Sequence, residues 1–334
     1  MKIYKVGGAV RDKQMGLEPK DIDWVVVGSS PEEMTKKGFK QVGKDFPVFL
    51  HPNTNEEYAL ARTDRKTGAG HKNFKFNFSP NVTLEEDLER RDLTINSMAI
   101  DEDENLIDPF NGARDIKNKC FRPVSSAFFE DPLRALRVAR FKSQFPEFFL
   151  HESMEQALNK ISSSNELSCL SSERVWGEVS RSLEYDFQEF LQIIQTYKLD
   201  KPWFAELSKI PDINSEICEI KWCEVSQANK FEFAKHLNIP KNYLKQLSLW
   251  EKFYEYDENG DINYKVRFFS DFTKNNLSEA VFTLQFFKNI NLECIPIIKE
   301  YVNFNFGDLS SNKKEEIMSI KEKELKKIIN KYGK

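Results

Sequence analysis

The sequence lacks the features that would place this chain in a membrane or in a disulfide-stabilised fold. No run of about 18 apolar residues occurs, so a membrane-spanning helix is not expected. The first residues contain no apolar stretch of the kind that a signal peptide needs. The five cysteines are odd in number and have no C-x-x-C spacing, which argues against a zinc site and predicts reduced thiols in a cytoplasmic protein.

An excess of positive charge is also absent. Lysine and arginine number 49 against 53 aspartates and glutamates, a formal net charge of −4. Any contact with a nucleic acid must therefore come from local basic patches. A length of 334 residues and a hydrophobic fraction of 40% are typical of a globular protein with more than one domain.

The segment that organises the chain is 20–27, with the sequence KDIDWVVV. Its β-branched run predicts a buried strand, and residues two apart in a strand project to the same face. Asp21 and Asp23 should therefore lie side by side at its start, where two carboxylates together with phosphate oxygens can hold Mg²⁺. For this segment in isolation, a solvated pair of aspartates is the alternative.

Paired glycines precede this strand. Gly7 and Gly8 follow a short β-rich segment and lead into a helical one that contains Arg11. Glycine lets the backbone approach a ligand closely, a helix N-terminus favours phosphate, and a guanidinium is a forked phosphate donor. Beside the aspartates this pattern suggests a nucleoside triphosphate with its Mg²⁺; a tight turn without a ligand is the alternative.

The pattern over residues 31–111 predicts small elements of both kinds. We expect a helix over 31–40, strands over 47–51 and 56–62, a loop over 64–81, helical spacing over 84–99 and a strand hairpin over 101–111. The second half of the 84–99 segment is crowded with polar residues suited to phosphate, ribose and base contacts: Arg90, Arg91, Asp92, Thr94 and Asn96.

A basic helix is predicted after Asp131. Pro132 suits the first helical position, which makes Asp131 a candidate N-cap. Arg134, Arg137 and Arg140 follow at intervals of three and fall within one arc of that helix. A capped helix with a solvated basic face is the alternative to a ligand site.

The rest of the chain predicts helices only, over 152–162, 171–184, 187–197, 226–237, 240–256, 276–303 and 311–332. The last of these lies in a tail that holds eight lysines against four glutamates between Ser311 and Lys334. Either a solvated face or contact with RNA phosphates explains these charges.

Six motifs occur in order, and together they resemble the motif set of the class II tRNA nucleotidyltransferases, the CCA-adding enzymes, in particular the gammaproteobacterial type. They are 7–12 (GGAVRD), 21–23 (DID), 90–96 (RRDLTIN), 108–112 (DPFNG), 130–134 (EDPLR) and 173–178 (ERVWGE). The close resemblance covers residues 1–180. It implies an α+β fold: a polymerase-β-like nucleotidyltransferase head, a mixed sheet with helices, over 1–120. An all-α remainder would follow, with a base-recognition neck over 121–185 and a tRNA-binding body and tail over 186–334.

The resemblance also implies an activity, the template-independent addition of the 3′-terminal CCA to tRNA, with CTP and ATP as substrates and pyrophosphate as product. Asp21 and Asp23 would bind two Mg²⁺ ions, which polarise the α-phosphate and activate the terminal ribose 3′-hydroxyl. Glu57 would be a third catalytic carboxylate. The partner would be tRNA, contacted at its 3′ end and its acceptor and T arms.

The remaining functional positions would bind ATP or CTP at phosphates, ribose and base: Gly8, Arg11, Arg91, Asp92, Asn96, Asp131, Arg134, Arg137 and Arg140. Asp131 and Arg134 would read the base. Cytosine and adenine each offer an exocyclic amino donor beside a ring-nitrogen acceptor, which suit a carboxylate and a guanidinium. Uracil and guanine offer a carbonyl in place of the amino group, which Asp131 would repel.

Two differences from the family's motifs limit the activities that we expect. None of the four histidines is followed by aspartate, so we expect a short form without His-Asp phosphohydrolase activity. Poly(A) polymerases of this class carry a glycine, two basic residues and a phenylalanine where this chain has GKDF at 43–46, which favours CCA addition. The alternatives are a CC-adding or A-adding enzyme, a poly(A) polymerase and, from another class, an inactive RNA-binding homologue.

Overall fold

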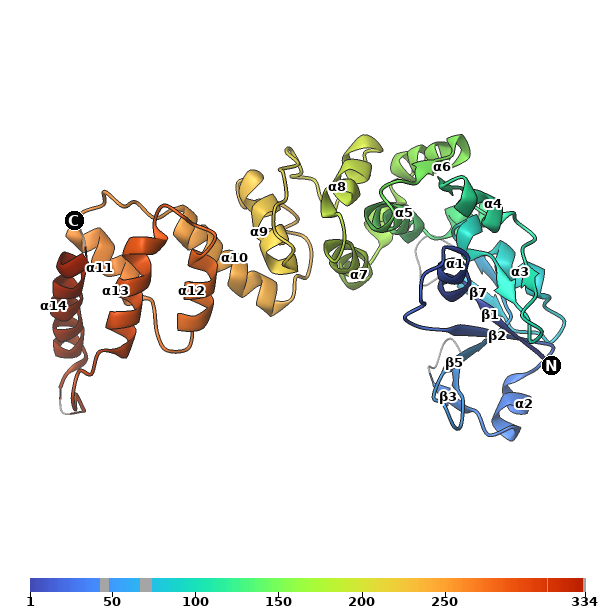
Figure 1. Cartoon of the computed structure of the whole chain (residues 1–334), viewed down its shortest axis with the longest axis horizontal. Coiled ribbons are helices and arrows are strands. Elements are labelled where there is room, and N and C mark those ends of the chain that lie inside the picture. Colours follow the sequence, from blue (N-terminus) through green and yellow to red (C-terminus); the bar gives the residue numbers. More distant parts are fainter. Residues whose placement is uncertain (43–47, 67–73, 311, 333–334) are drawn as a thin grey trace. The chain divides into compact units, whose positions relative to one another are not determined.

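The structure, a computed structural model, describes residues 1–42, 48–66, 74–310 and 312–332 (Figure 1). The chain forms two compact units. The first comprises Met1–Ile213 and Glu232–Asn238, and the second comprises Asn214–Phe231 and Ile239–Lys334. Within the described ranges, no helix is both long enough and apolar enough to span a membrane.

The first unit opens with a mixed sheet, whose described strands run in the order β3-β4-β5-β2-β1-β8-β9. These strands are β1 (Lys2–Val6), β2 (Asp23–Val27), β3 (Lys40–Val42), β4 (Val48–Leu50), β5 (Glu57–Leu60), β8 (Ala99–Ile100) and β9 (Leu106–Ile107). Strand β2 is antiparallel to β1 and parallel to β5. The predicted α+β head with a mixed sheet is confirmed.

Strand β2 is buried on both faces, as its valine run predicts. Val25 packs in the same cluster as Leu88 of helix α3 (Leu84–Glu89). Val26 packs on the opposite face, in a cluster with Met34 of α2 (Pro31–Lys36). Because this strand is held from both sides, the aspartate at its first position has a fixed backbone.

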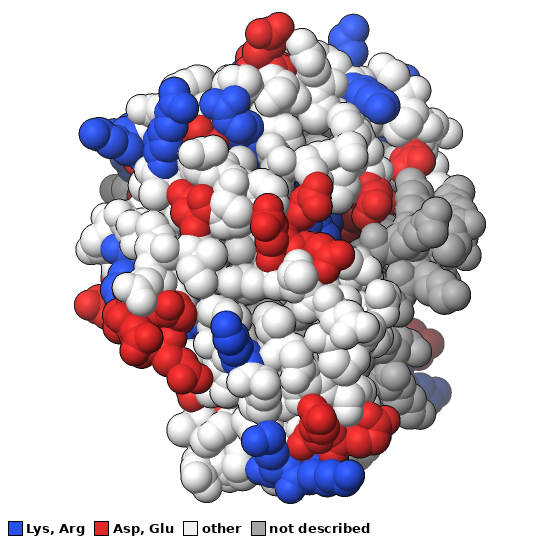
Figure 2. All heavy atoms as spheres, turned by 90° about the vertical axis from the view of Figure 1, so that its right-hand side faces the viewer, with Lys and Arg blue, Asp and Glu red and all other residues white. Residues whose placement is uncertain are grey.

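The head also contains α1 (Gly8–Gln14), α4 (Gly112–Lys117) and a 3₁₀ turn, Thr94–Asn96. Acidic and basic side chains are interspersed on the face of the head that Figure 2 shows. Neither positive nor negative side chains cover that face alone, which agrees with the small net charge of the chain.

A helical region completes the first unit, with α5 (Leu133–Gln144), α6 (Glu152–Ser163), α7 (Ser172–Leu183) and α8 (Phe187–Thr196). Short parallel strands β10 (Cys120–Phe121) and β11 (Phe149–Leu150) precede and follow α5. Helix α5 packs against α7 and α8, and its apolar positions, Leu136 and Ala139 among them, are buried. Packing on two sides fixes the direction in which the arginines of α5 project.

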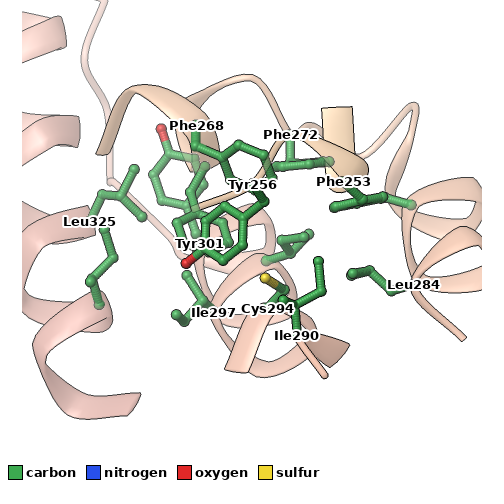
Figure 3. Packing of buried hydrophobic residues seen from close by; sticks show 14 of the residues in the cluster. Phe253, Tyr256, Phe268, Phe272, Leu284, Ile290, Cys294, Ile297, Tyr301 and Leu325 are labelled. Atoms are coloured by element: carbon green, nitrogen blue, oxygen red, sulfur yellow. The ribbon is translucent and has the colours of Figure 1, made fainter. Parts of the chain in front are cut away.

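The second unit is helical where it is described, with α9 (Cys218–Ala228), α10 (Lys241–Tyr254), α11 (Ile262–Ser270), α12 (Leu277–Leu284), α13 (Asn291–Asn303) and α14 (Lys314–Tyr332). Its core is rich in aromatic side chains, and Figure 3 shows Phe253, Tyr256, Phe268 and Phe272 packed together. Ring contacts such as Phe253–Phe272, with centroids 5.6 Å apart, add to the burial of apolar area.

Several predicted elements of the head need correction. Residues 64–81 are not simply a loop, because β6 (Thr63–Lys66) and β7 (Phe74–Asn77) pair as an antiparallel ladder. The helix over 84–99 ends at Glu89. The backbone N–H of Leu93 donates to the carboxylate of its neighbour Asp92 at 2.8 Å, and such local side-chain bonds compete with helix continuation.

In the helical regions, one predicted helix is shifted, one is divided into two, and one helix was not predicted. The helix expected over 226–237 lies at Cys218–Ala228, and the residues after it include left-handed conformations at Lys230, Phe231 and Ala234. The segment 276–303 is divided into α12 and α13, and α11 was not predicted. No glycine or proline stands between α12 and α13, whereas Gly260 precedes α11 and Pro240 precedes α10.

Candidate active site

A pocket of about 530 Å³ lies in the first unit, lined by residues of α1, the 90–96 segment, α5 and α7. Its described lining is strongly cationic. It contains nine arginines (Arg11, Arg62, Arg90, Arg91, Arg134, Arg137, Arg140, Arg174 and Arg181) and three aspartates (Asp23, Asp92 and Asp131). The difference is a formal +6, in a chain whose net charge is −4. A pocket with this balance favours a polyanion.

Gly7 brings the first of these groups together. It lies at the end of β1 with φ 71° and ψ −131°, a conformation open almost only to glycine. A Cβ at this position would lie 2.8 Å from Nη1 of Arg91 and 3.9 Å from Oδ2 of Asp23. The absence of a side chain at Gly7 therefore lets a cation and a carboxylate approach the start of α1.

The acidic residues near the pocket come from two neighbouring strands. Asp23 is the first residue of β2 and is exposed, and Asp21 is exposed in the turn before it. Because Trp24 pairs with Tyr58 in the parallel register of β2 and β5, Glu57 lies beside Asp23. Both line a smaller pocket of about 210 Å³.

These carboxylates are the type of ligand that Mg²⁺ prefers, but they do not form a complete binding site by themselves. Exposed Asp23, Glu57 and Asp21 offer the hard oxygen donors that Mg²⁺ takes, and this ion usually completes its shell with water and substrate phosphates. Among the described residues, no group of three or more potential ligands is close enough to hold a metal by itself. A site that borrows ligands from a triphosphate is consistent with both observations.

Asp87 anchors the arginines on the head side. It lies on α3 with no exposed surface, accepts from Arg90 at 2.6 Å and Arg91 at 3.2 Å, and receives the backbone N–H of Arg62 at 3.2 Å. Burial works to raise the pKa of Asp87, but the two guanidinium groups hold it below its usual range. One buried carboxylate thus orients three pocket residues.

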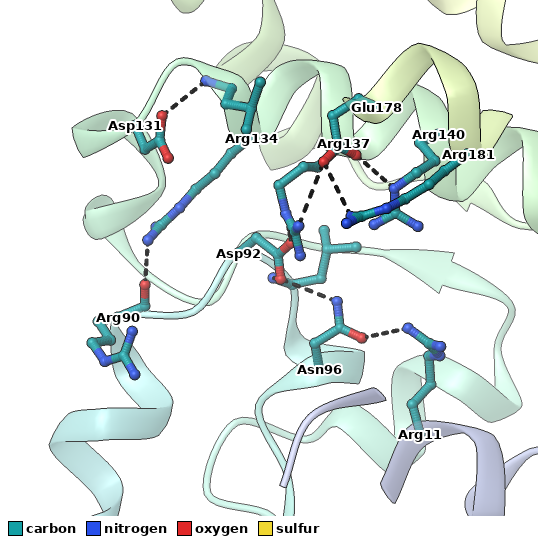
Figure 4. A network of polar contacts seen from close by, with 12 residues as sticks. Arg11, Arg90, Asp92, Asn96, Asp131, Arg134, Arg137, Arg140, Glu178 and Arg181 are labelled. Carbon is teal, nitrogen blue, oxygen red and sulfur yellow. Dashed lines mark hydrogen bonds and ion pairs between the residues drawn. The ribbon is translucent and has the colours of Figure 1, made fainter. Parts of the chain in front are cut away.

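A second network crosses from α1 to α5 through Asp92 (Figure 4). Nη1 of Arg11 donates to Asn96 at 2.9 Å, and Nδ2 of Asn96 donates to Oδ1 of Asp92 at 3.0 Å. Nε of Arg137 donates to Oδ2 of Asp92 at 2.7 Å. Burial alone would raise the pKa of Asp92, but Arg137, Asn96 and the charge of Arg134 keep it far below its usual range. Asp92 is therefore an anion at neutral pH, oriented from both sides.

Glu178 of α7 holds the arginines farther along α5. It accepts from Nε of Arg140 at 2.6 Å, and Nη1 of Arg137 and of Arg181 lie 3.8 and 3.6 Å from its Oε1. Glu178 is 3% exposed, and burial also lowers the pKa of Arg140, against the effect of this carboxylate. A single glutamate faces three arginines, so the group retains positive charge.

The two predicted base-reading residues both line the pocket and are held by other groups. Asp131 accepts from the backbone N–H of Leu133 at 3.1 Å and from Nη2 of Arg174 at 2.6 Å. Arg134 donates to the backbone carbonyls of Ala127 at 2.7 Å and Arg90 at 2.5 Å. Burial lowers the pKa of Arg134. Both side chains are fixed before any ligand enters.

The structure thus brings together all nine residues predicted to bind the nucleotide, and Asp23 with them. Asp21 and Glu57 do not line this pocket. Two further lining residues, Gly7 and Arg90, had been suggested as ligand contacts by their local sequence but were not in the predicted nucleotide-binding set. Sequence reasoning assigned no role to five others: Arg62, Leu133, Phe141, Arg174 and Arg181. Leu133 and Arg174 stand inside the quoted motifs, whereas no sequence signal points to Arg62 or Arg181. The GKDF segment at 43–46 lies outside the described residues.

Comparison with known proteins assigns the class. Residues 3–122 match the family model of the poly A polymerase head domain, so this part of the first unit has the fold of a polymerase-β-like head. Over part of its length, the chain is similar to proteins named as CCA-adding enzymes. It is 54% identical over 210 residues to the multifunctional CCA protein of Pseudoalteromonas atlantica, an alignment that covers 62% of this chain and 52% of that protein. It is 55% identical over 183 residues to the CCA-adding enzyme of Coxiella burnetii, which covers 55% and 49%. The chain thus spans about half the length of these curated relatives.

Solved structures extend the likeness of fold along the whole chain. The Thermotoga maritima CCA-adding enzyme complexed with tRNA_CCA aligns with a TM-score of 0.67 at 21% identity, over 99% of this chain and 87% of that one. The Bacillus stearothermophilus CCA-adding enzyme in complex with CTP aligns with a TM-score of 0.62 at 21% identity, over 98% and 78%. At this identity the likeness establishes the fold alone.

Proposed function

We propose that this chain adds the 3′-terminal CCA to tRNA, using CTP and ATP and releasing pyrophosphate. The observation that carries the proposal is the arginine-lined pocket, in which the glycine turn, the 90–96 segment and α5 meet. Relatives with 54–55% identity over 183–210 residues are named for this activity. These alignments cover about half of each relative, so the activity of the whole chain requires a direct test.

The pocket residues supply binding and charge stabilisation. Nucleotidyl transfer joins the RNA 3′-oxygen to the α-phosphorus and breaks the bond to pyrophosphate, so negative charge accumulates on the leaving group. Preorganised cations aimed at that charge lower the barrier without reorganisation during the reaction. Arg11 and Arg91, fixed by Asn96 and Asp87, suit this role. Mg²⁺, when held by Asp21 and Asp23, supplies Lewis-acid activation of the phosphate.

Selection of the base is assigned to Asp131 and Arg134. Asp131 presents a carboxylate oriented by Leu133 and Arg174, and it suits the amino groups of cytosine and adenine. Arg134 is close enough to line the same pocket, and its charge complements a ring-nitrogen acceptor. Selection for two bases and against two would then need no nucleic-acid template.

The direct test is nucleotide incorporation into tRNA that lacks one, two or three terminal residues, with CTP and ATP supplied separately and together. Full CCA addition predicts that CTP alone extends the shortest tRNA by two residues and that ATP then adds one. Arrest after two cytidines would indicate a CC-adding enzyme, and extension of only the longest substrate an A-adding enzyme. Long adenosine tails would indicate a poly(A) polymerase. RNA binding without incorporation would indicate an inactive homologue.

The metal assignment is tested by Asp21→Ala and Asp23→Ala. Each variant should lose nucleotide addition while keeping its fold and tRNA binding, because both carboxylates are exposed and neither supports the core. Glu102→Ala removes an exposed acid elsewhere on the head and serves as the matched control. Turnover above a few per cent in Mg²⁺ for either aspartate variant contradicts this role.

A further inference from the structure

Phe141 lines the arginine pocket and has so far been assigned no role. It is on α5, is 3% exposed and contributes to the pocket lining. Three guanidinium carbons lie over its ring. Those of Arg140, Arg11 and Arg137 are 4.0, 5.4 and 5.7 Å from the ring centroid. All three distances fall within the range in which a cation is attracted to an aromatic face.

These cations come from different parts of the first unit. Arg11 projects from α1 of the head, whereas Arg137 and Arg140 share α5 with the ring. Residues four apart on a helix are neighbours, which places Arg137 over Phe141. Arg11 also lies 5.4 Å from the ring of Phe145. Phe141 thus joins the head and the helix that together line the site.

Hydrogen bonds and the aromatic ring act on different parts of these arginines. Arg137 and Arg140 donate through Nε to Asp92 and Glu178, and Arg11 donates to Asp12 and Asn96. These bonds act within the plane of each guanidinium, whereas the π face of Phe141 adds an attraction to the charge as a whole. The arginines also repel one another, because the lining holds nine cations and three anions. An aromatic face offers negative charge density without a carboxylate, which would itself repel a phosphate. An aliphatic side chain of similar volume offers none.

We infer that Phe141 is a positioning residue of the nucleotide site, whose π face holds Arg11, Arg137 and Arg140 in the orientation that receives the phosphates of the incoming nucleotide. This inference rests on the proposed function in naming the ligand as a nucleoside triphosphate. Phe141 acts through the arginines and takes no part in the chemistry.

The test varies the electrostatics of the ring while keeping its shape. Phe141 is replaced in the full chain by phenylalanine carrying one, two or three ring fluorines, which withdraw density from the π face, and separately by leucine. Each fluorine should raise KM for both CTP and ATP by a further factor of about two, and Phe141→Leu should raise it about tenfold. The value of kcat should change less than KM, since the leaving group is stabilised by other arginines as well. A ring that only fills space predicts no trend with fluorine number, and that outcome overturns the inference.

Phe148 provides the matched control. It is 2% exposed, stacks on Phe121 at 5.0 Å and does not line the pocket. Fluorination there should leave KM unchanged, and Phe148→Leu should affect thermal stability without a selective rise in KM. An equal fluorine trend at both positions contradicts a specific role for Phe141.

A binding measurement separates this inference from the proposed function. Inorganic tripolyphosphate, titrated into each variant by calorimetry, should bind progressively more weakly along the fluorine series. If the wild-type chain adds no nucleotide but tripolyphosphate follows the series, the activity is wrong and the role of Phe141 stands. If the wild-type chain adds CCA and neither KM nor tripolyphosphate affinity follows the series, the activity stands and the role of Phe141 is wrong.

Discussion

Replacement of Asp92 by asparagine tests the network that spans the site. The side chain of Asp92 is 6% exposed, and its partner Arg137 is 31% exposed. Asparagine keeps the shape and an acceptor for Asn96 but removes the charge that Arg137 faces. Removing one partner of a fully buried ion pair costs about 3–5 kcal/mol. Because water reaches about a third of the Arg137 side chain, and Glu178 lies 3.8 Å away, we expect the lower end, about 3 kcal/mol.

The expected loss is measurable by thermal or denaturant unfolding. For a folding unit of this size, 1 kcal/mol corresponds to about 2–4 °C, so Asp92→Asn should lower Tm by about 6–12 °C. Asn118→Ala is a suitable reference, since this residue only ends α4. A change below about 1 kcal/mol would mean that the Asp92–Arg137 pair contributes little, in the manner of a surface pair.

The pH dependence supplies an independent check of the cause. The pKa of Asp92 is lowered in the folded state, so its stabilising contribution is fully present above the unfolded-state pKa, near 4, and is lost as the pH falls below it. Between pH 7 and pH 3 the stability difference between wild type and Asp92→Asn should shrink by about 1 kcal/mol. A difference independent of pH over this range would refute the electrostatic explanation, whatever the size of the effect at pH 7.

Two further predictions concern single contacts of the pocket. Gly7→Ala should destabilise the first unit by about 1–3 kcal/mol and raise KM for both nucleotides, because the new Cβ displaces Nη1 of Arg91. Calorimetry measures the loss of stability, and steady-state kinetics measure KM. Gly16→Ala is the control: Gly16 also has a positive φ but has open space around it, so this variant shows the effect of backbone strain without displacement of an arginine. Arg134→Ala should lower kcat/KM for CTP and ATP and reduce discrimination against UTP and GTP by about ten- to a hundredfold; preserved selectivity for C and A in a four-nucleotide incorporation assay would eliminate Arg134 as a base reader.

The sequence was informative where a local pattern has one structural solution. The β-rich run of residues 24–27 predicted a buried strand, and in the structure Val25 and Val26 pack in separate clusters on its two faces. The arginines three apart predicted one side of a helix, which α5 has. The sequence pattern did not predict that these arginines are buried. Arg140 is 8% exposed because α7 brings Glu178 against it. Contacts between residues 38 positions apart depend on the packing of whole helices.

The error over residues 84–99 has its physical origin in a side chain that bonds to neighbouring backbone. Helical spacing continues from Leu84 to Ala99, and periodicity alone predicts one helix. The helix ends at Glu89, and Arg91, Asp92 and Asn96 of the following segment line the pocket. The carboxylate of Asp92 bonds to Leu93, and Asn96 follows within a 3₁₀ turn. Local side-chain bonding and tertiary packing override helix propensity here.

The two sequence-level interpretations of Asp131, as helix N-cap and as base reader, are not alternatives in the structure. One carboxylate oxygen accepts from the N–H of Leu133 at the start of α5, which is the contact expected of a capping residue. The other faces Arg174, and the residue lines the pocket. A carboxylate has about four acceptor positions, so two fixed donors leave room for a ligand amino group. Fixation by the helix start is also what a base reader requires, because a freely rotating carboxylate would accept from a donor in any direction and would discriminate poorly. Loss of Asp131 should therefore reduce stability and selectivity together, and a stability loss alone does not argue against recognition of the base.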